Sequence, residues 1–442
     1  MSVLTAFGRI FFCKEVLLTA KLRIVYPICC GVDVHRDFLV ACIASTNKQG
    51  VTTYESKRFS TYTGQLREFG IWLLDRNCHD VCMESTGKYW FPVHNILTPL
   101  GLNVVVCHPK FVKAIKGKKT DKKDAQWISD LFKHDLVRGS FIPPEDIRQL
   151  RDLCRYWCKL THYTTGEKNR AQNCLTVSNF KLDDVFTNVF GKSATTIIDQ
   201  LLINMGEPFD VAPYIHKLCK TPIAVIQEAV DGAFTSEQAE KLKIIRQHID
   251  YIAVLKTNLE EVIFKLAEPY HPQIELLLSV PGIKDRITAI RIIAEIGVDM
   301  PVFESAKHLA SWCGLAPQNN ESAGKKKTTR IGKAGAYIKP LLVQIALAAS
   351  KSKANPEISS KYQMLKKRRG GKKARIAIAR RIVVAIYNML LKNEAYDGTL
   401  YSKFEVIPEK REVTATQAFA ILRKQGFFIK DVDSPHDIAL LA

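Results

Sequence analysis

The chain has 442 residues, of which 47% are hydrophobic, and its 64 Lys or Arg and 44 Asp or Glu give a formal net charge of +20. This length is enough for two or three domains with cores of their own, and the composition excludes a chain that is disordered throughout. The positive charge favours a polyanionic partner, nucleic acid before an anionic membrane surface. Because no stretch holds about 18 or more uncharged apolar residues, we expect no membrane-spanning helix.

Strands and helices are predicted to alternate from Tyr26 to about Ser140. A β-rich run, ICCGVDVHRDFLVACIAS, leads toward GVTTYESKRFS, which is typical of a hairpin. Further along, HDVCMEST and NVVVCHP are predicted as short buried strands, with helical segments around them. The pattern indicates an α/β sheet domain over residues 26–140.

Four acidic residues of this domain lie in predicted strands or at the start of a predicted helix. Asp33 lies in the first strand and Glu84 ends the strand in HDVCMEST; open α/β sheets place ligands at such strand ends, and a buried charge is unfavourable unless it is paired or metal-bound. Asp121 and Asp124 begin an amphipathic helix and share one face of it. By themselves these two would suit helix capping and the helix dipole.

As a set, the four acids predict a two-metal site. Carboxylate ligands select Mg²⁺ or Mn²⁺ rather than zinc, and two such ions about 3.5–4 Å apart assist phosphodiester chemistry. The neighbouring lysines are expected to contact phosphates: Lys118, Lys119, Lys122 and Lys123. Other polar residues close by in the sequence are interpreted as bystanders: His35, Asp37, Asp130 and Asp135.

Residues 141–270 are predicted to form a helical, coiled-coil-like connector, because apolar residues recur at intervals of three and four. Long helices could pair within the chain or between subunits, and the heptad register is imperfect. Cys154, Cys158 and His162 fall on one helical stripe, but a zinc site needs a fourth ligand and none stands at a useful spacing, so packed thiols are preferred. The twelve cysteines show no secreted disulfide framework, which predicts a reducing cytoplasm.

Aromatic residues alternate with cations in RYWCKLTHYTTGEKNRAQN. Tyr156, Trp157 and Tyr163 could stack on unpaired bases, as aromatic residues of RNA-binding proteins do. Core packing is an equally good interpretation of Trp157.

A mostly helical C-terminal domain is expected over residues 271–395, followed by an unassigned tail, 396–442. SVPGIKDRITAIRIIAEIG is similar to a helix-hairpin-helix, although a plain helix N-terminus explains it nearly as well. The segment ESAGKKKTTRIGKAG is expected to be a loop. Between Glu321 and Arg380 there are 17 Lys or Arg and two acids, so this window carries +15 of the +20 charge.

Such a concentration of charge predicts a phosphate-binding surface with salt-sensitive affinity. The candidate contacts are Lys325, Lys326, Lys327, Arg330, Lys333, Lys366, Lys367, Arg368, Arg369, Lys372 and Lys373.

GVDVH, ESTGKYWFPV and KKTDKKDAQWISDLF resemble the signature of DEDD insertion-sequence transposases, the one-ten family of bridge-RNA-guided recombinases. ESAGKKKTTRIGKAGAYIKPLL resembles the C-terminal transposase domain of that family. The resemblance runs from about Tyr26 to Asn393, with both halves in the expected order. Since the family pattern begins near Tyr26, residues 1–25 are interpreted as an extension from an upstream start codon, and no signal-peptide cleavage pattern is found in them.

The resemblance implies an RNase H-like (RuvC-like) domain in which the four acids hold metal. It also implies that Ser322 attacks DNA to form a 5′-phosphoserine, with metal-bound acids of one subunit acting beside the serine of another. Ala323 and Gly324 would let a DNA backbone approach, although the family often has serine or glycine where Ala323 stands. Without the resemblance, a serine before glycine is usually a turn residue. Ser311 is the alternative nucleophile, but its helical, apolar setting indicates packing.

We therefore predict an α/β plus α protein: a cytoplasmic, Mg²⁺- or Mn²⁺-dependent DNA transposase that acts on element ends and target DNA. The resemblance adds a structured guide RNA and a homodimer or homotetramer as partners. Two alternatives stay open. A RuvC-like nuclease or junction resolvase would use water only, and a non-catalytic nucleic-acid-binding protein would keep the acids for structure.

Overall fold

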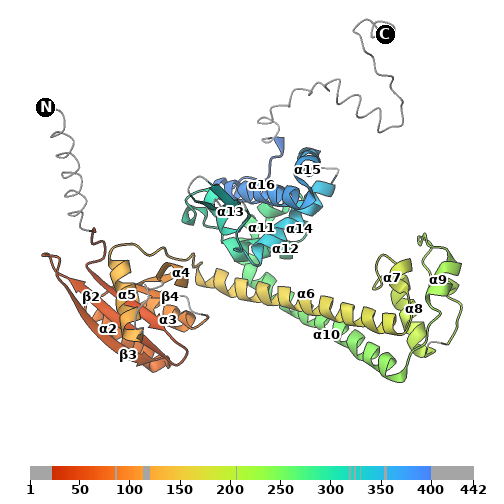
Figure 1. Ribbon diagram of the computed structural model, residues 1–442, viewed down its shortest axis with the longest axis horizontal. Helices are drawn as coiled ribbons and strands as arrows, with labels where there is room; N and C mark the ends of the chain where they lie inside the picture. The colour runs from red at the N-terminus through yellow and green to blue at the C-terminus, as the bar shows by residue number, and fades with distance from the viewer. Residues whose placement is uncertain are drawn as a thin grey trace, which may run out of the picture. The chain divides into compact units, whose positions relative to one another are not determined.

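The computed structural model describes residues 22–84, 87–112, 120–205, 207–317, 320–322, 325–328, 330–352 and 356–399. The chain divides into two compact units, Met1–Arg148 and Gln149–Ala442 (Figure 1). Within the described ranges, the helices are too short or too polar to cross a membrane.

The first unit is built on a mixed sheet of five strands in the order β3-β2-β1-β4-β5. β1, β2 and β3 form an antiparallel meander, and β4 and β5 continue the sheet parallel to β1. The β-rich run of the sequence thus contains two strands, because the chain turns back at residues 35–37. The strands are β1 (Ile28–Val34), β2 (Phe38–Thr46), β3 (Thr52–Ser60), β4 (Asp80–Glu84) and β5 (Asn103–Cys107).

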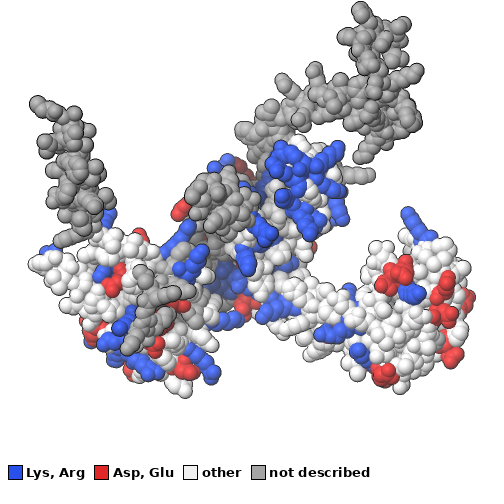
Figure 2. All heavy atoms as spheres, viewed as in Figure 1, with Lys and Arg blue, Asp and Glu red and all other residues white. Residues whose placement is uncertain are grey.

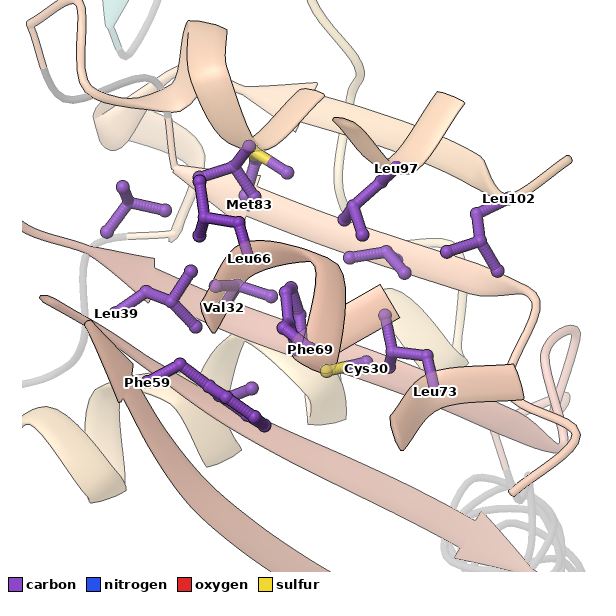
Figure 3. Packing of buried hydrophobic residues seen from close by; sticks show 14 of the residues in the cluster. Cys30, Val32, Leu39, Phe59, Leu66, Phe69, Leu73, Met83, Leu97 and Leu102 are labelled. Atoms are coloured by element: carbon purple, nitrogen blue, oxygen red, sulfur yellow. The ribbon is translucent and has the colours of Figure 1, made fainter. Parts of the chain in front are cut away.

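Helices cover both faces of this sheet. On one face, α2 (Thr63–Leu74) and α3 (Trp90–Leu97) bury a core that includes Phe59 and Phe69 (Figure 3). On the other face, α5 (Asp121–Lys133) packs Ile128 and Phe132 against the sheet. The remaining short helices are η1 (Thr98–Leu100) and α4 (Pro109–Val112). The sheet is therefore the middle layer of three, and α5 brings Asp121 and Asp124 to its second face.

The side chains of strand β1 alternate between the two faces of the sheet. Cys30, Val32 and Val34 belong to the α2–α3 core. Because side chains of a strand alternate, Gly31 and Asp33 belong to the face that α5 covers. A Cβ atom on Gly31 would overlap the α5 backbone at Ala125 and Ser129. The glycine thus allows α5 to cross the strand directly, two positions before Asp33.

In the second unit, two long helices lie side by side and run antiparallel, α6 (Glu145–Val177) and α10 (Ser236–Ala267) (Figure 1). Trp157 contacts Glu260, and Glu167 contacts His248 further along, which fixes the direction of the pairing. The two long helices predicted for this region therefore pair within the chain.

In the chain between the two long helices, short helices pack with parts of α6 and α10 around a small core, which includes Phe180, Ile197 and Leu242 of α10. These helices are α7 (Leu182–Val185), α8 (Lys192–Ile203), η2 (Ala212–Tyr214) and α9 (Ile223–Ala229).

The remainder of the second unit is a helical cluster with one small hairpin. Its elements are η3 (Glu268–Tyr270), α11 (His271–Leu278), α12 (Arg286–Ile296), η4 (Met300–Val302), α13 (Ala306–Trp312), β6 (Asn320–Ser322), β7 (Lys325–Thr328), α14 (Ile338–Lys351), α15 (Pro356–Arg369) and α16 (Gly371–Lys392). Gly282, between α11 and α12, has a φ of +92°, and a Cβ there would overlap the carbonyl oxygen of Ile345 in α14. The glycine of the predicted helix-hairpin-helix thus serves packing between helices.

Candidate functional site

Two of the predicted acids extend from adjacent parallel strands. The register of β1 and β4 pairs Val32 with Met83, so the next residues, Asp33 and Glu84, occupy neighbouring positions. Both are partly buried. Parallel strands expose their carboxyl ends at the same edge of a sheet, which is where ligands bind in such folds.

The other two acids come from the first turn of α5. Thr120 caps this helix, its hydroxyl oxygen accepting a hydrogen bond from the backbone N–H of Lys123 at 3.3 Å. Asp121 and Asp124 follow in the first turn, Asp121 exposed and Asp124 partly buried. The cap fixes where the helix starts, and the close crossing at Gly31 fixes where it lies on the sheet.

The carboxylates of Glu84, Asp121 and Asp124 lie close enough to Asp33 to influence its charge. Burial raises the pKa of this carboxyl, and the carboxylates of Glu84, Asp121 and Asp124 raise it further, while His35 lowers it. The Asp33 side chain is only 14% exposed. Like charges held this close favour either a proton or a cation among them.

His35 completes the cluster, although it was predicted to be a bystander. Its Nε2 atom lies 3.2 Å from Oδ2 of Asp33 and 3.7 Å from Oδ1 of Asp121. This nitrogen is buried and makes no hydrogen bond. The ring is held against Phe38, with 4.6 Å between ring centroids, and the guanidinium of Arg58 lies 3.8 Å from the Phe38 centroid. The sequence signal that could have identified His35 is its position two residues after Asp33.

The donor set fits a divalent cation. One ligand atom from each of Asp33, His35 and Asp121 lies within 4.8 Å of the others. Carboxylate oxygens suit Mg²⁺ and Mn²⁺, and an imidazole nitrogen suits Mn²⁺ better than Mg²⁺. The buried nitrogen without a hydrogen bond is what a site built for a cation would contain.

The other bystanders have structural explanations. Asp130 accepts hydrogen bonds from Tyr54 at 2.6 Å and Lys133 at 2.7 Å, which ties α5 to β3. Asp37 is exposed and pairs with Arg36. Asp135 has a φ of +56° just after α5. Among the predicted lysines, Lys122 and Lys123 are exposed on α5, and Lys118 and Lys119 lie outside the described residues.

Ser322 lies in the small hairpin of the second unit. Its backbone pairs with Lys325 across β6 and β7, and the side chains of residues 321–328 lie outside the described part. This segment was expected to be a loop, and that prediction was wrong for the two strands. Ser311 is on α13, as expected for a helix, but it is exposed rather than packed, since Leu309 and Ala310 take the buried face.

The basic residues of α15, α16 and their surroundings are on the surface. Figure 2 shows Lys and Arg gathered over the α15–α16 hairpin. The exposed members among the predicted contacts are Arg330, Lys333, Lys366, Lys367, Arg368, Arg369, Lys372 and Lys373. Lys325, Lys326 and Lys327 are on β7, and their side chains lie outside the described part.

Trp157 is held by protein contacts. Its indole N–H donates to Glu260 at 2.6 Å, and Lys256 and Arg291 lie 4.0 and 5.0 Å from its ring centroid. These contacts favour the packing interpretation for Trp157. Tyr156 and Tyr163 are 50% and 56% exposed.

The three candidate zinc ligands on α6, Cys154, Cys158 and His162, differ in burial. Cys154 and Cys158 are buried, whereas His162 is exposed. Burial raises the pKa of the Cys154 thiol to about 12. A metal ligand must be a thiolate, so this setting favours the packed-thiol interpretation.

Two family models match separate parts of the chain. A family model described as "Transposase", of the DEDD type, matches residues 30–179, and the model of the "Transposase IS116/IS110/IS902 family" matches residues 274–363. The chain belongs to the IS110 family of transposases.

A curated relative gives a second line of comparison. The chain is similar to the pilin gene-inverting protein of Moraxella bovis, with 30% identity over 159 residues. This match covers 36% of the chain, and the chain spans about half the length of that relative, 48%.

Proposed function

We propose that this transposase cleaves and transfers DNA strands using divalent cations held by Asp33, Glu84, Asp121 and Asp124, with His35 as a further donor. The observation that carries the proposal is that three acids, Glu84 from β4 and Asp121 and Asp124 from α5, lie near Asp33 of β1. Two strand-borne acids followed by two on a helix is also the order in RNase H-like nucleases. That order and the mixed five-stranded sheet support an RNase H-like first unit.

The chain's own residues prepare the site for the cation. Cations bound there would stabilise negative charge on the attacking and leaving oxygens of a phosphodiester. Asp33 and Glu84 present their carboxylates from rigid strands, and Thr120 sets the position of Asp121 and Asp124 through the helix start. Phe38 holds the His35 ring so that Nε2 faces the acids.

Ser322 is the proposed nucleophile. In the reaction, its Oγ would bond to phosphorus, the bond from phosphorus to the 3′ oxygen would break, and the 3′ oxygen would leave as a hydroxyl. The product is a 5′-phosphoserine that a later 3′-hydroxyl can attack. Support comes from the family and from the hairpin, which puts Ser322 next to the turn and opposite Lys325.

The remaining parts of the proposal follow from the family resemblance. A structured RNA would guide the choice of DNA, subunits would act as a homodimer or homotetramer, and the protein would work on DNA in the cytoplasm. The exposed basic residues of α15 and α16 support contact with nucleic-acid phosphates.

A denaturing gel tests the proposed chemistry. The protein is incubated with labelled element DNA, guide RNA and Mg²⁺ and then denatured, and we expect labelled DNA on wild-type protein. Ser322→Ala and Asp33→Asn should yield no adduct, whereas the control Ser311→Ala should behave as wild type. An adduct in Ser322→Ala would move the nucleophile elsewhere. Full cleavage by Ser322→Ala without any adduct would favour the nuclease that uses water only. Full function in Asp33→Asn would favour the non-catalytic nucleic-acid-binding protein.

A further inference from the structure

A groove of about 1050 Å³ lies in the second unit, where α15 and α16 meet the base of the β6–β7 hairpin. The isolated bridge between Pro317 and Ile331 closes the hairpin at this point, and both residues line the groove. The volume is slightly above the range of about 300–1,000 Å³ that small-molecule sites occupy, so the groove has room for more than one nucleoside.

The lining combines two kinds of surface. Leu315, Leu365 and Ile376 give it an apolar part, with Ala374 and Ala377 between the larger side chains. Five cationic side chains also line it, and the twelve lining residues include no Asp or Glu. The cations are Arg330, Arg369, Lys372, Lys373 and Arg380.

This combination selects among polyanions. A DNA duplex turns its phosphates outward and keeps its bases stacked inside, so it would use the cations and leave the apolar surface exposed to water. An unpaired strand offers phosphates and the faces of its bases together, which is how single-stranded nucleic acid is generally bound. Free phosphate has no apolar group to cover the apolar part of the lining.

We propose that this groove holds an unpaired DNA strand, with its bases on the apolar surface and its phosphates on the five cations. The choice of DNA rests on the proposed function, because β6 begins three residues after Pro317 and ends at Ser322, the proposed nucleophile. A strand seated in the groove would pass the base of the hairpin that carries this serine. The groove would thereby hold an unpaired strand close to the proposed point of cleavage.

Fluorescence anisotropy of labelled 12-nucleotide strands tests the proposal in EDTA, so that metal chemistry plays no part. One strand is ordinary DNA and the other has the same backbone with abasic central positions. Wild-type protein should bind the base-bearing strand about tenfold more tightly, since only that strand buries apolar base surface. Ala377→Phe fills the groove at an exposed position, and it should lower affinity for the base-bearing strand to the abasic level.

The controls separate this site from general charge and from catalysis. Asn388→Phe adds the same ring at an exposed position of α16 outside the lining, and it should keep the tenfold difference. Ser322→Ala should also bind as wild type, so a failure of the serine chemistry would leave this result intact. Equal binding of both strands by wild type, or an unchanged difference in Ala377→Phe, would overturn the proposal. An RNA strand bound more than tenfold tighter than DNA would overturn the choice of DNA.

Discussion

His35 and Asp33 lie two residues apart, and the Nε2 atom of His35 is 3.2 Å from Oδ2 of Asp33. The same nitrogen is 3.7 Å from Asp121, and it makes no hydrogen bond. A polar atom buried in this way loses its water without regaining a partner of good geometry. A cation between the imidazole and the two carboxylates would satisfy all three groups.

Direct ligation by His35 should be visible with Mn²⁺ as the probe. Pulsed electron paramagnetic resonance of Mn²⁺-loaded wild type should show nitrogen coupling from a bound imidazole, and His35→Ala should lose it. His35→Ala should weaken Mn²⁺ binding by about tenfold. Because imidazole suits Mn²⁺ better than Mg²⁺, the loss of Mg²⁺ affinity should be smaller. His79→Ala, at an exposed histidine on the same unit, should change neither. A wild-type spectrum without nitrogen coupling would exclude His35 as a ligand.

Asp33 should destabilise the metal-free fold at neutral pH. Burial, and then Glu84, Asp121 and Asp124, raise its pKa, so the folded state holds this proton to a higher pH than the unfolded state does. Protonation of Asp33 therefore stabilises the folded state as the pH falls through the raised pKa. Above that pKa the protein lacks this stabilisation. Asp33→Asn should raise the Tm in EDTA at pH 7 by about 2–4 °C, the effect of about 1 kcal/mol.

Calorimetry in EDTA measures this effect, with Asp37→Asn as the control at an exposed aspartate. The advantage of Asp33→Asn should shrink as the pH is lowered, since the wild-type carboxyl then takes up its own proton. A lower Tm for Asp33→Asn than for wild type at pH 7 would show that the ionised carboxylate stabilises the fold.

Gly31 should be required for the position of α5. An alanine Cβ would overlap the α5 backbone at Ala125 and Ser129, so Gly31→Ala should push the helix away from β1. Overpacking of this kind costs about 1–3 kcal/mol. The free energy of unfolding should fall by that amount, and Mn²⁺ affinity should fall with it because Asp121 and Asp124 move.

Gly64→Ala is the matched control, since Gly64 lies in α2 and an added Cβ meets nothing within 4 Å. It should be neutral or slightly stabilising. Gly31→Ala protein with wild-type stability and metal affinity would show that α5 can shift without consequence for the site.

Glu295 should stabilise the second unit through α6. Its side chain, 8% exposed, accepts two hydrogen bonds from Arg155, at 2.7 and 2.9 Å. Glu295→Gln removes the charge that this partly buried guanidinium faces, and chemical denaturation should show a loss of about 2 kcal/mol. Glu240→Gln breaks an exposed pair with Lys243 and should lose less than about 1 kcal/mol. Equal losses would mean that burial of the Glu295 pair has no energetic effect.

The sequence predicts those features of the fold that depend on local pattern. The strands that carry Asp33 and Glu84, the helix that begins at Asp121 and the long helices α6 and α10 all follow from periodicity and turn residues. The β6–β7 strands were missed because their residues, NES and KKKT, show no alternation of apolar and polar side chains.

Features that depend on packing were not accessible from sequence. The role of His35 depends on the ring contact with Phe38 across the turn between β1 and β2, and the need for Gly31 depends on a helix some 90 residues later in the chain. The groove joins Leu315 and Arg330 to α15 and α16, which only the tertiary structure brings together.

Calorimetric titration with Mn²⁺ tests the central claim most directly. Wild-type protein should bind the ion, and Asp33→Asn, Glu84→Gln, Asp121→Asn and Asp124→Asn should each weaken binding by about tenfold or more, while the control Asp37→Asn should not. Affinity that is unchanged in all four variants would contradict a metal centre built from these acids.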